Sequence, residues 1–138
     1  MARLRRSRRR GAAAIEFALC FPIFIAILFG ILEYGWIFYQ QANVIAAVRS
    51  GVRFGVTQDP DTQTSYLADA ESTVRTSLAG LGIRPADLAD ADIIASVSPS
   101  ASATNLLSVA CTVPYTPVVG LIPTPTQISY TMTMLMEN

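Results

Sequence analysis

Residues 12–39 form the longest apolar stretch of the chain. Residues 17–32 carry no charge and lie between Glu16 and Glu33. They give about 24 Å of helix, whereas a bilayer core of about 30 Å takes roughly 20 residues. Alanines before this run and aromatic residues after it supply the missing length, and aromatic side chains gather where a helix leaves the hydrocarbon core. The pattern predicts one transmembrane helix over residues 12–39.

Helical spacing continues beyond this segment. One face recurs at intervals of three or four residues, through Ile37, Gln41, Val44, Val48 and Val52. This stripe predicts an amphipathic extension over residues 40–55, and hence one helix from about Ala12 to Phe54. Gly51 and Gly55 have the spacing of a small-residue packing pair. Because they lie outside the bilayer, we interpret them as the end of the helix.

The remaining residues, 56–138, change their period twice. After an Asp-Pro loop, helical spacing predicts a second helix through Leu67, Ala70, Val74, Leu78 and Leu81. A short strand candidate lies at 93–97, and two later segments, 107–115 and 128–136, alternate apolar and polar side chains as half-buried strands do. Two helices followed by three strands predict an α+β fold, in which a three-stranded antiparallel sheet packs on the helices.

Charge divides the chain unevenly, although the formal net charge is zero. Residues 1–11 carry six of the ten arginines and no acid, and the rest carries the other four arginines and all ten acids. The positive-inside bias predicts a cytoplasmic leader over residues 1–11 and an extracytoplasmic domain over residues 56–138. A nucleic-acid-binding tail is the alternative, but arginines directly before an apolar helix favour the topology signal. We expect no nucleic-acid partner.

The composition excludes several kinds of chemistry. The chain has no histidine and no lysine, which removes histidine catalysis, histidine metal sites and lysine Schiff bases. Asp87, Asp90 and Asp92 lack the spacing of a calcium loop, so we interpret them as a solvated acidic loop. We expect no catalytic site, no cofactor, no metal and no small-molecule substrate, and therefore no enzyme.

Sulfur-containing side chains are interpreted as structural. Met132, Met134 and Met136 alternate along the last predicted strand, which favours sheet core over a copper site. Cys20 lies in the membrane helix and Cys111 in the outer domain. The helix between them is too long for a disulfide within one straight chain, so we expect Cys111 to be a buried free thiol.

Glu16 lies one turn into the apolar stretch. A carboxylate at bilayer depth is costly, so this residue is a functional candidate. If the chain were cut after Gly11, Ala12 would carry a new ammonium, and that group on a neighbouring helix would pair with Glu16. The alternative is a carboxylate that reaches back to the inner membrane surface. Pro22 removes one backbone hydrogen bond and predicts a gentle bend, either one used in subunit packing or an ordinary transmembrane proline.

The segment around Glu16 carries a family resemblance. Gly11, Ala12, Glu16 and Phe17, followed by Pro22, Gly30, Glu33 and Gly35, resemble the TadE-like family, whose members are pilin-like proteins of bacterial tight-adherence (type IV-related) pilus systems. The resemblance covers residues 9–55 well and the C-terminal strands loosely. It implies that a prepilin peptidase cuts between Gly11 and Ala12, and that Glu16 pairs with the N-terminus of a neighbouring subunit during assembly.

These observations predict a minor pilin-like subunit, or pseudopilin, needed for assembly of a tight-adherence pilus. The predicted location is the bacterial inner membrane, with a single span and the N-terminus in the cytoplasm. The resemblance implies as partners other pilins and minor pilins, the prepilin peptidase, the pilus assembly platform in the membrane and an assembly ATPase. The alternative is an uncleaved single-span anchor with an extracytoplasmic protein-interaction domain.

Overall fold

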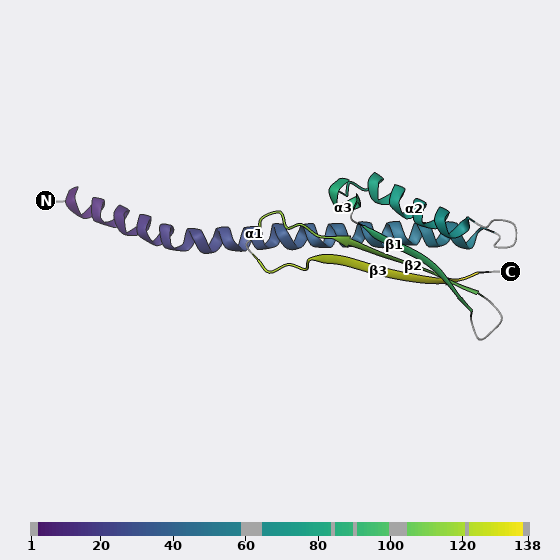
Figure 1. The fold of residues 1–138 in the computed structure, drawn as a ribbon. Helices are drawn as coiled ribbons and strands as arrows, with labels where there is room; N and C mark the ends of the chain where they lie inside the picture. The colour runs from purple at the N-terminus through teal and green to yellow at the C-terminus, as the bar shows by residue number, and fades with distance from the viewer. Residues whose placement is uncertain are drawn as a thin grey trace.

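One long helix runs through most of the molecule, and a small domain packs along its C-terminal half (Figure 1). The computed structural model describes residues 3–58, 65–83, 85–89, 91–99, 105–120 and 122–136. Helix α1 spans Arg3–Val56. Its N-terminal half projects alone, while α2 (Tyr66–Gly80), α3 (Pro85–Ala89) and the sheet lie along its other half.

Helix α1 is longer than predicted at both ends. It already includes the arginine-rich leader from Arg3 on and ends at Val56, against the predicted range from Ala12 to Phe54. Arginine and alanine are strong helix formers, so the leader continues the helix. The helix also passes through Pro22 without ending there. Its N-terminal half curves gently (Figure 1).

The sheet confirms the predicted α+β fold. Strands β1 (Asp92–Pro99), β2 (Asn105–Pro114) and β3 (Gln127–Leu135) form a three-stranded antiparallel sheet in the order β1-β2-β3. In this register Ile93 pairs with Cys111, and Cys111 in turn with Tyr130. Alternation of apolar side chains along β2 places one face of this central strand fully against the helices.

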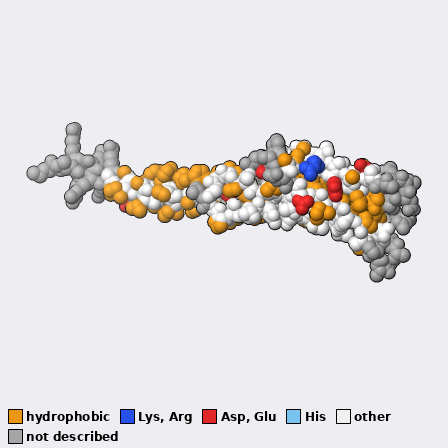
Figure 2. Space-filling model, in the orientation of Figure 1, with side chains coloured by type: hydrophobic (Ala, Val, Ile, Leu, Met, Phe, Trp, Pro, Cys, Tyr) orange, Lys and Arg blue, Asp and Glu red, His pale blue; other side chains and the backbone are white. Residues whose placement is uncertain are grey.

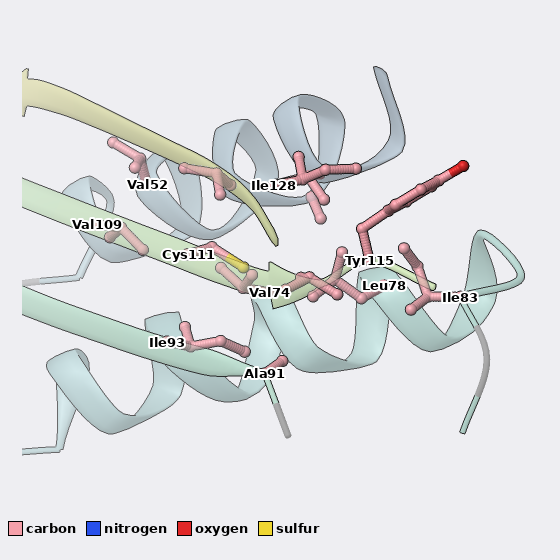
Figure 3. Packing of buried hydrophobic residues seen from close by; sticks show 14 of the residues in the cluster. Val52, Val74, Leu78, Ile83, Ala91, Ile93, Val109, Cys111, Tyr115 and Ile128 are labelled. Atoms are coloured by element: carbon pink, nitrogen blue, oxygen red, sulfur yellow. The ribbon is translucent and has the colours of Figure 1, made fainter. Parts of the chain in front are cut away.

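The core lies between the inner face of the sheet and the helices α1 and α2 (Figure 3). Its fully buried side chains come from all three layers and include Val48, Val52, Val74, Leu78, Leu107, Val109 and Cys111. Met132 and Met134 pack against this cluster and Met136 lies within it, which confirms their assignment to the sheet core. Dense apolar packing of this kind supplies most of the stability of a small domain.

Gly51 lies inside α1, five residues before the helix ends at Val56, so its interpretation as a helix end was wrong, whereas Gly55 is the second-to-last residue of the helix. A Cβ at Gly51 would overlap Val74 Cγ2 and lie 2.9 Å from the carbonyl oxygen of Ala70. A Cβ at Gly55 would lie 2.6 Å from Leu107 Cδ2. The two glycines therefore let α1 approach α2 and β2 closely, which is the packing role that their spacing signals within a bilayer.

Two further predictions need correction. Gln41 is exposed, and Gln40 is the buried residue at 2% exposure, because the stripe on α1 steps by three residues after Ile37 rather than by four. The expected solvated acidic loop is wrong for Asp87, which is buried in α3, whereas Asp92 is exposed and Asp90 lies outside the described residues. Arg75 of α2 contacts α3 by donating a hydrogen bond to the Leu88 carbonyl oxygen at 2.9 Å.

Cys111 and Cys20 are both free thiols, and Cys111 is buried as expected. Burial raises the pKa of the Cys111 thiol from 9.0 to about 11. The cause is desolvation, since a thiolate in the apolar core would lose its water shell.

The close approach at Gly51 gives a first prediction. Gly51→Ala is expected to destabilise the domain by about 1–3 kcal/mol, because the new methyl group forces α2 away from α1. Gly35→Ala is the matched control, since a Cβ there meets nothing within 4 Å in the same helix. It is expected to stabilise the helix by up to about 1 kcal/mol. Thermal unfolding in detergent measures both changes, and equal effects would contradict the packing role.

The buried thiol gives a second prediction. Between pH 9 and about 11 the unfolded chain ionises Cys111 while the folded domain keeps the thiol protonated. Stability is therefore expected to fall as the pH rises through this window. Cys111→Ala removes this contribution, so its unfolding midpoint should depend less steeply on pH than that of the unaltered chain. Parallel slopes in the two proteins would argue against a buried thiol.

Candidate membrane and assembly site

The N-terminal half of α1 exposes apolar side chains all around its circumference. Its large hydrophobic residues from Ile15 to Leu32 are mostly half or more exposed, and Figure 2 shows hydrophobic side chains along the visible face of the rod that projects from the domain. Among the described residues, α1 is the helix that is long and apolar enough to cross a membrane. Residues 12–32 give about 31 Å of helix, close to the thickness of a hydrocarbon core.

The residues predicted for processing and assembly all lie on this projecting segment. Gly11, Ala12, Glu16, Phe17 and Pro22 are exposed, and the domain covers none of them. The Phe17 ring packs on Phe21 with centroids 5.3 Å apart. Within the part of the chain that the structure describes, the Glu16 side chain has no hydrogen bond or ion pair. The fold therefore leaves this carboxylate open to a partner from another molecule.

A second carboxylate, Glu33, is held by the domain. Its side chain is 1% exposed. The Tyr115 hydroxyl donates to Oε1 at 2.6 Å, the Val118 N–H donates to Oε1 at 3.0 Å, and the Val119 N–H donates to Oε2 at 2.7 Å. We call this arrangement of Glu33, Tyr115, Val118 and Val119 the Glu33 clasp. Hydrogen bonds to both oxygens offset the cost of burying the charge.

Local sequence explains why the β2–β3 connection can form the clasp. Tyr115 continues the buried alternation of β2 by one residue, and its N–H donates to the Thr126 carbonyl at 2.9 Å, which closes the base of the connection. Gly120 adopts a positive φ of 69°, a conformation that favours glycine, and turns the chain back. The successive N–H groups of Val118 and Val119 then point toward one carboxylate, as in other backbone anion sites.

The clasp marks where the environment of α1 changes. Up to residue 28 nearly all positions of the helix are exposed, residues 29 and 30 are half-buried, and from Glu33 onward one face is buried under the domain. One turn before the clasp, a Cβ at Gly30 would lie 3.0 Å from Ile122 Cδ1, so the connection also contacts this level. Domain contacts on α1 thus begin inside the range 12–39 that the sequence predicts to span the membrane.

Polar side chains farther along α1 fasten it to α2. The Asn43 Nδ2 atom donates to the Leu81 carbonyl at 3.2 Å, and the Tyr39 hydroxyl donates to the same oxygen at 3.3 Å. The Ser50 and Ser77 hydroxyls lie 2.9 Å apart. These bonds orient α2 on the helix and leave the opposite face of α1 uncovered.

In the described ranges no three acidic or cysteine side chains gather as metal ligands would.

Sequence reasoning missed the role of Glu33. The available signal was its position, since it is the acid that ends the uncharged run of α1. Its three donors come from residues more than 80 positions later, a separation that no local spacing rule can detect.

Comparison with known proteins bears on this same helix. Residues 11–53 match the family model described as TadE-like protein. The match covers 43 of the 138 residues, so the similarity to TadE-like proteins lies in the first helix. The resemblance drawn from Gly11, Glu16 and Phe17 is thereby confirmed. The search of curated proteins and the search of solved structures each returned no match. The TadE-like segment holds the projecting helix, the acidic member of the clasp and Gly51, and it stops before α2 and the sheet. Together with the apolar helix, it fits a membrane protein related to the tight-adherence pilus.

The clasp gives a third prediction. In Glu33→Gln an amide N–H₂ replaces one acceptor oxygen and faces a backbone donor, so hydrogen exchange at the Val118 and Val119 amides should accelerate by roughly tenfold or more. Glu16→Gln makes the same chemical change on the projecting half of α1 and should leave both rates unchanged. Amide exchange followed by NMR or mass spectrometry measures the effect. Rapid exchange of both amides in the unaltered protein would rule out the clasp.

Proposed function

We propose that this chain is a minor pilin-like subunit, a pseudopilin, that takes part in assembly of a tight-adherence pilus. The observation that carries the proposal is the TadE-like helix, which projects from the domain and bears Glu16 without a partner among the side chains that the structure describes. An isolated carboxylate on an apolar helix is costly in lipid unless a positive group meets it. A neighbouring subunit can supply that group.

The membrane arrangement follows from charge and length. Residues 12–32 span the inner membrane, the arginines of residues 1–11 stay in the cytoplasm, and the domain lies outside. Other pilins and minor pilins pack against the projecting half of α1, and the assembly platform meets it within the membrane. The exposed face of that half-helix leaves room for these contacts.

Processing after Gly11 would supply the positive group. The new ammonium at Ala12 of one subunit would pair with Glu16 of its neighbour and set how far the two helices are staggered. Gly11 and Ala12 lie on the part of α1 that the domain does not cover, so a prepilin peptidase in the membrane can reach them. Glycine also weakens the helix at the site, which eases the local unwinding that cleavage needs.

One observation favours the second function, an uncleaved single-span anchor. Helix α1 is continuous from Arg3 through Gly11, so the peptide bond after Gly11 is helical rather than extended. A helical bond must unwind before a peptidase can bind it. An anchor would keep residues 1–11 and present the domain to another envelope protein.

The mass of the protein recovered from cells separates these two functions and forms the fourth prediction. The pseudopilin is expected to begin at Ala12, and Gly11→Val should retain residues 1–11, because a β-branched side chain hinders access to the bond. Gly35→Val lies in the same helix and should be processed normally. Intact-mass spectrometry measures all three chains. Recovery of the unaltered chain with its leader still attached would favour the anchor.

The role of Glu16 is tested separately by pilus assembly. Glu16→Gln keeps the size of the side chain but removes its charge, so we expect processed subunits and loss of pili. Glu16→Asp retains the charge and should restore part of the assembly. Electron microscopy of cells that carry each variant shows the outcome. Normal pili with Glu16→Gln would refute the pairing.

A further inference from the structure

The β2–β3 connection lies lower on α1 than the rest of the domain. Figure 1 shows it passing across α1 and reaching farther toward the N-terminal half than α2, α3 or the strands do. The Ile122 side chain lies beside Gly30, three residues before Glu33. Three residues correspond to about 4.5 Å along the helix axis. If residues 12–32 span the hydrocarbon core, Ile122 lies at the level of the membrane surface or just inside it.

The chemistry of this connection suits a lipid surface. Val118 is 62% exposed although its N–H is held by the clasp. The sequence has no charged residue from Ile93 to Met136, a range that includes the whole connection. Before this range, the charged residues that follow Glu33 all lie between Arg49 and Asp92 in the sequence. Arg49 and Arg53 are exposed and lie four or more helical turns past Glu33 on α1. An uncharged, apolar tip is what contact with the interfacial layer requires.

Several backbone N–H groups of the connection already have hydrogen-bond acceptors within the protein, as a surrounding with little water requires. Unpaired N–H groups are costly in lipid. Glu33 accepts hydrogen bonds from the Val118 and Val119 amides, and Thr126 accepts one from the Tyr115 amide. The clasp therefore satisfies backbone donors at the tip while it fixes the tip against the helix.

Aromatic residues continue this surface around α1. Tyr34 and Phe38 are exposed on the two turns that follow Gly30. Tyrosine and other aromatic side chains are enriched at the level of lipid headgroups. Gly30, Tyr34 and Phe38 recur every four residues, so the two aromatic side chains lie on the face of α1 that Ile122 meets at Gly30.

We propose that Val118 and Ile122 insert into the lipid interface when α1 spans a bilayer, so that the domain contacts the membrane through the β2–β3 connection as well as through its helix. The proposal rests on the membrane insertion described under the proposed function. The Glu33 clasp sets how deeply the connection lies, because it joins the connection to a fixed position on α1. Two points of contact restrict the rocking of the domain on the membrane.

Depth-dependent fluorescence quenching tests this contact and forms the fifth prediction. The single tryptophan is first removed with Trp36→Phe. One tryptophan is then placed in the full chain by Val118→Trp, Phe24→Trp or Leu135→Trp. Phe24 and Leu135 are each 57% exposed, one on the projecting helix and one at the far end of β3. Leu135 lies about 26 Å along the strand from Gln127, where β3 leaves the connection.

The proteins are placed at low density in vesicles of phosphatidylethanolamine and phosphatidylglycerol that contain lipids brominated along their acyl chains. Tryptophan at position 118 is expected to be quenched several-fold more than at position 135, and to an extent approaching that at position 24. If the tryptophan at position 24 is quenched but the tryptophan at position 118 is quenched no more than that at position 135, the inferred contact is overturned while membrane insertion of the helix still holds. Absence of quenching at 24 would overturn membrane insertion itself, and this inference with it.

Discussion

The two halves of helix α1 have different surroundings, and the buried carboxylate of Glu33 lies where one half ends and the other begins. Toward the N-terminus the helix is apolar on all sides, a pattern that is unfavourable in water and favourable in lipid. Toward the C-terminus it is apolar on one face and packs under a small domain. The hydrogen bonds from the β2–β3 connection to Glu33 fix the position on α1 at which the domain begins to cover one face of the helix.

The domain depends on α1 because it has little core of its own. Three strands and two short helices cannot bury enough apolar surface by themselves, so Val44, Val48 and Val52 of α1 complete the cluster. Gly51 and Gly55 make this possible by letting α2 and β2 come close to the helix axis.

Much of this arrangement could be predicted from the sequence. Alternation along 107–115 identified β2 and its buried face, because successive side chains of a strand point to opposite faces and only one face packs on the core. The apolar helix and its TadE-like motif were equally clear. The roles of Gly51, Glu33 and Asp87 could not be found in this way. Each depends on which segment, distant in the sequence, packs against it, and on whether a polar group there is satisfied or solvated.

The central claim is that α1 passes from lipid to a water-facing domain at Glu33. Spin labels on single cysteines placed one by one over residues 24–40, in vesicles and with Cys20 and Cys111 replaced, measure this transition through their accessibility to oxygen and to a water-soluble nickel complex. The account predicts oxygen-accessible positions all around the helix up to residue 28, and nickel access on the uncovered face alone from residue 33 onward. Nickel access at position 24, or oxygen-dominated labels around the whole helix as far as position 40, would contradict it.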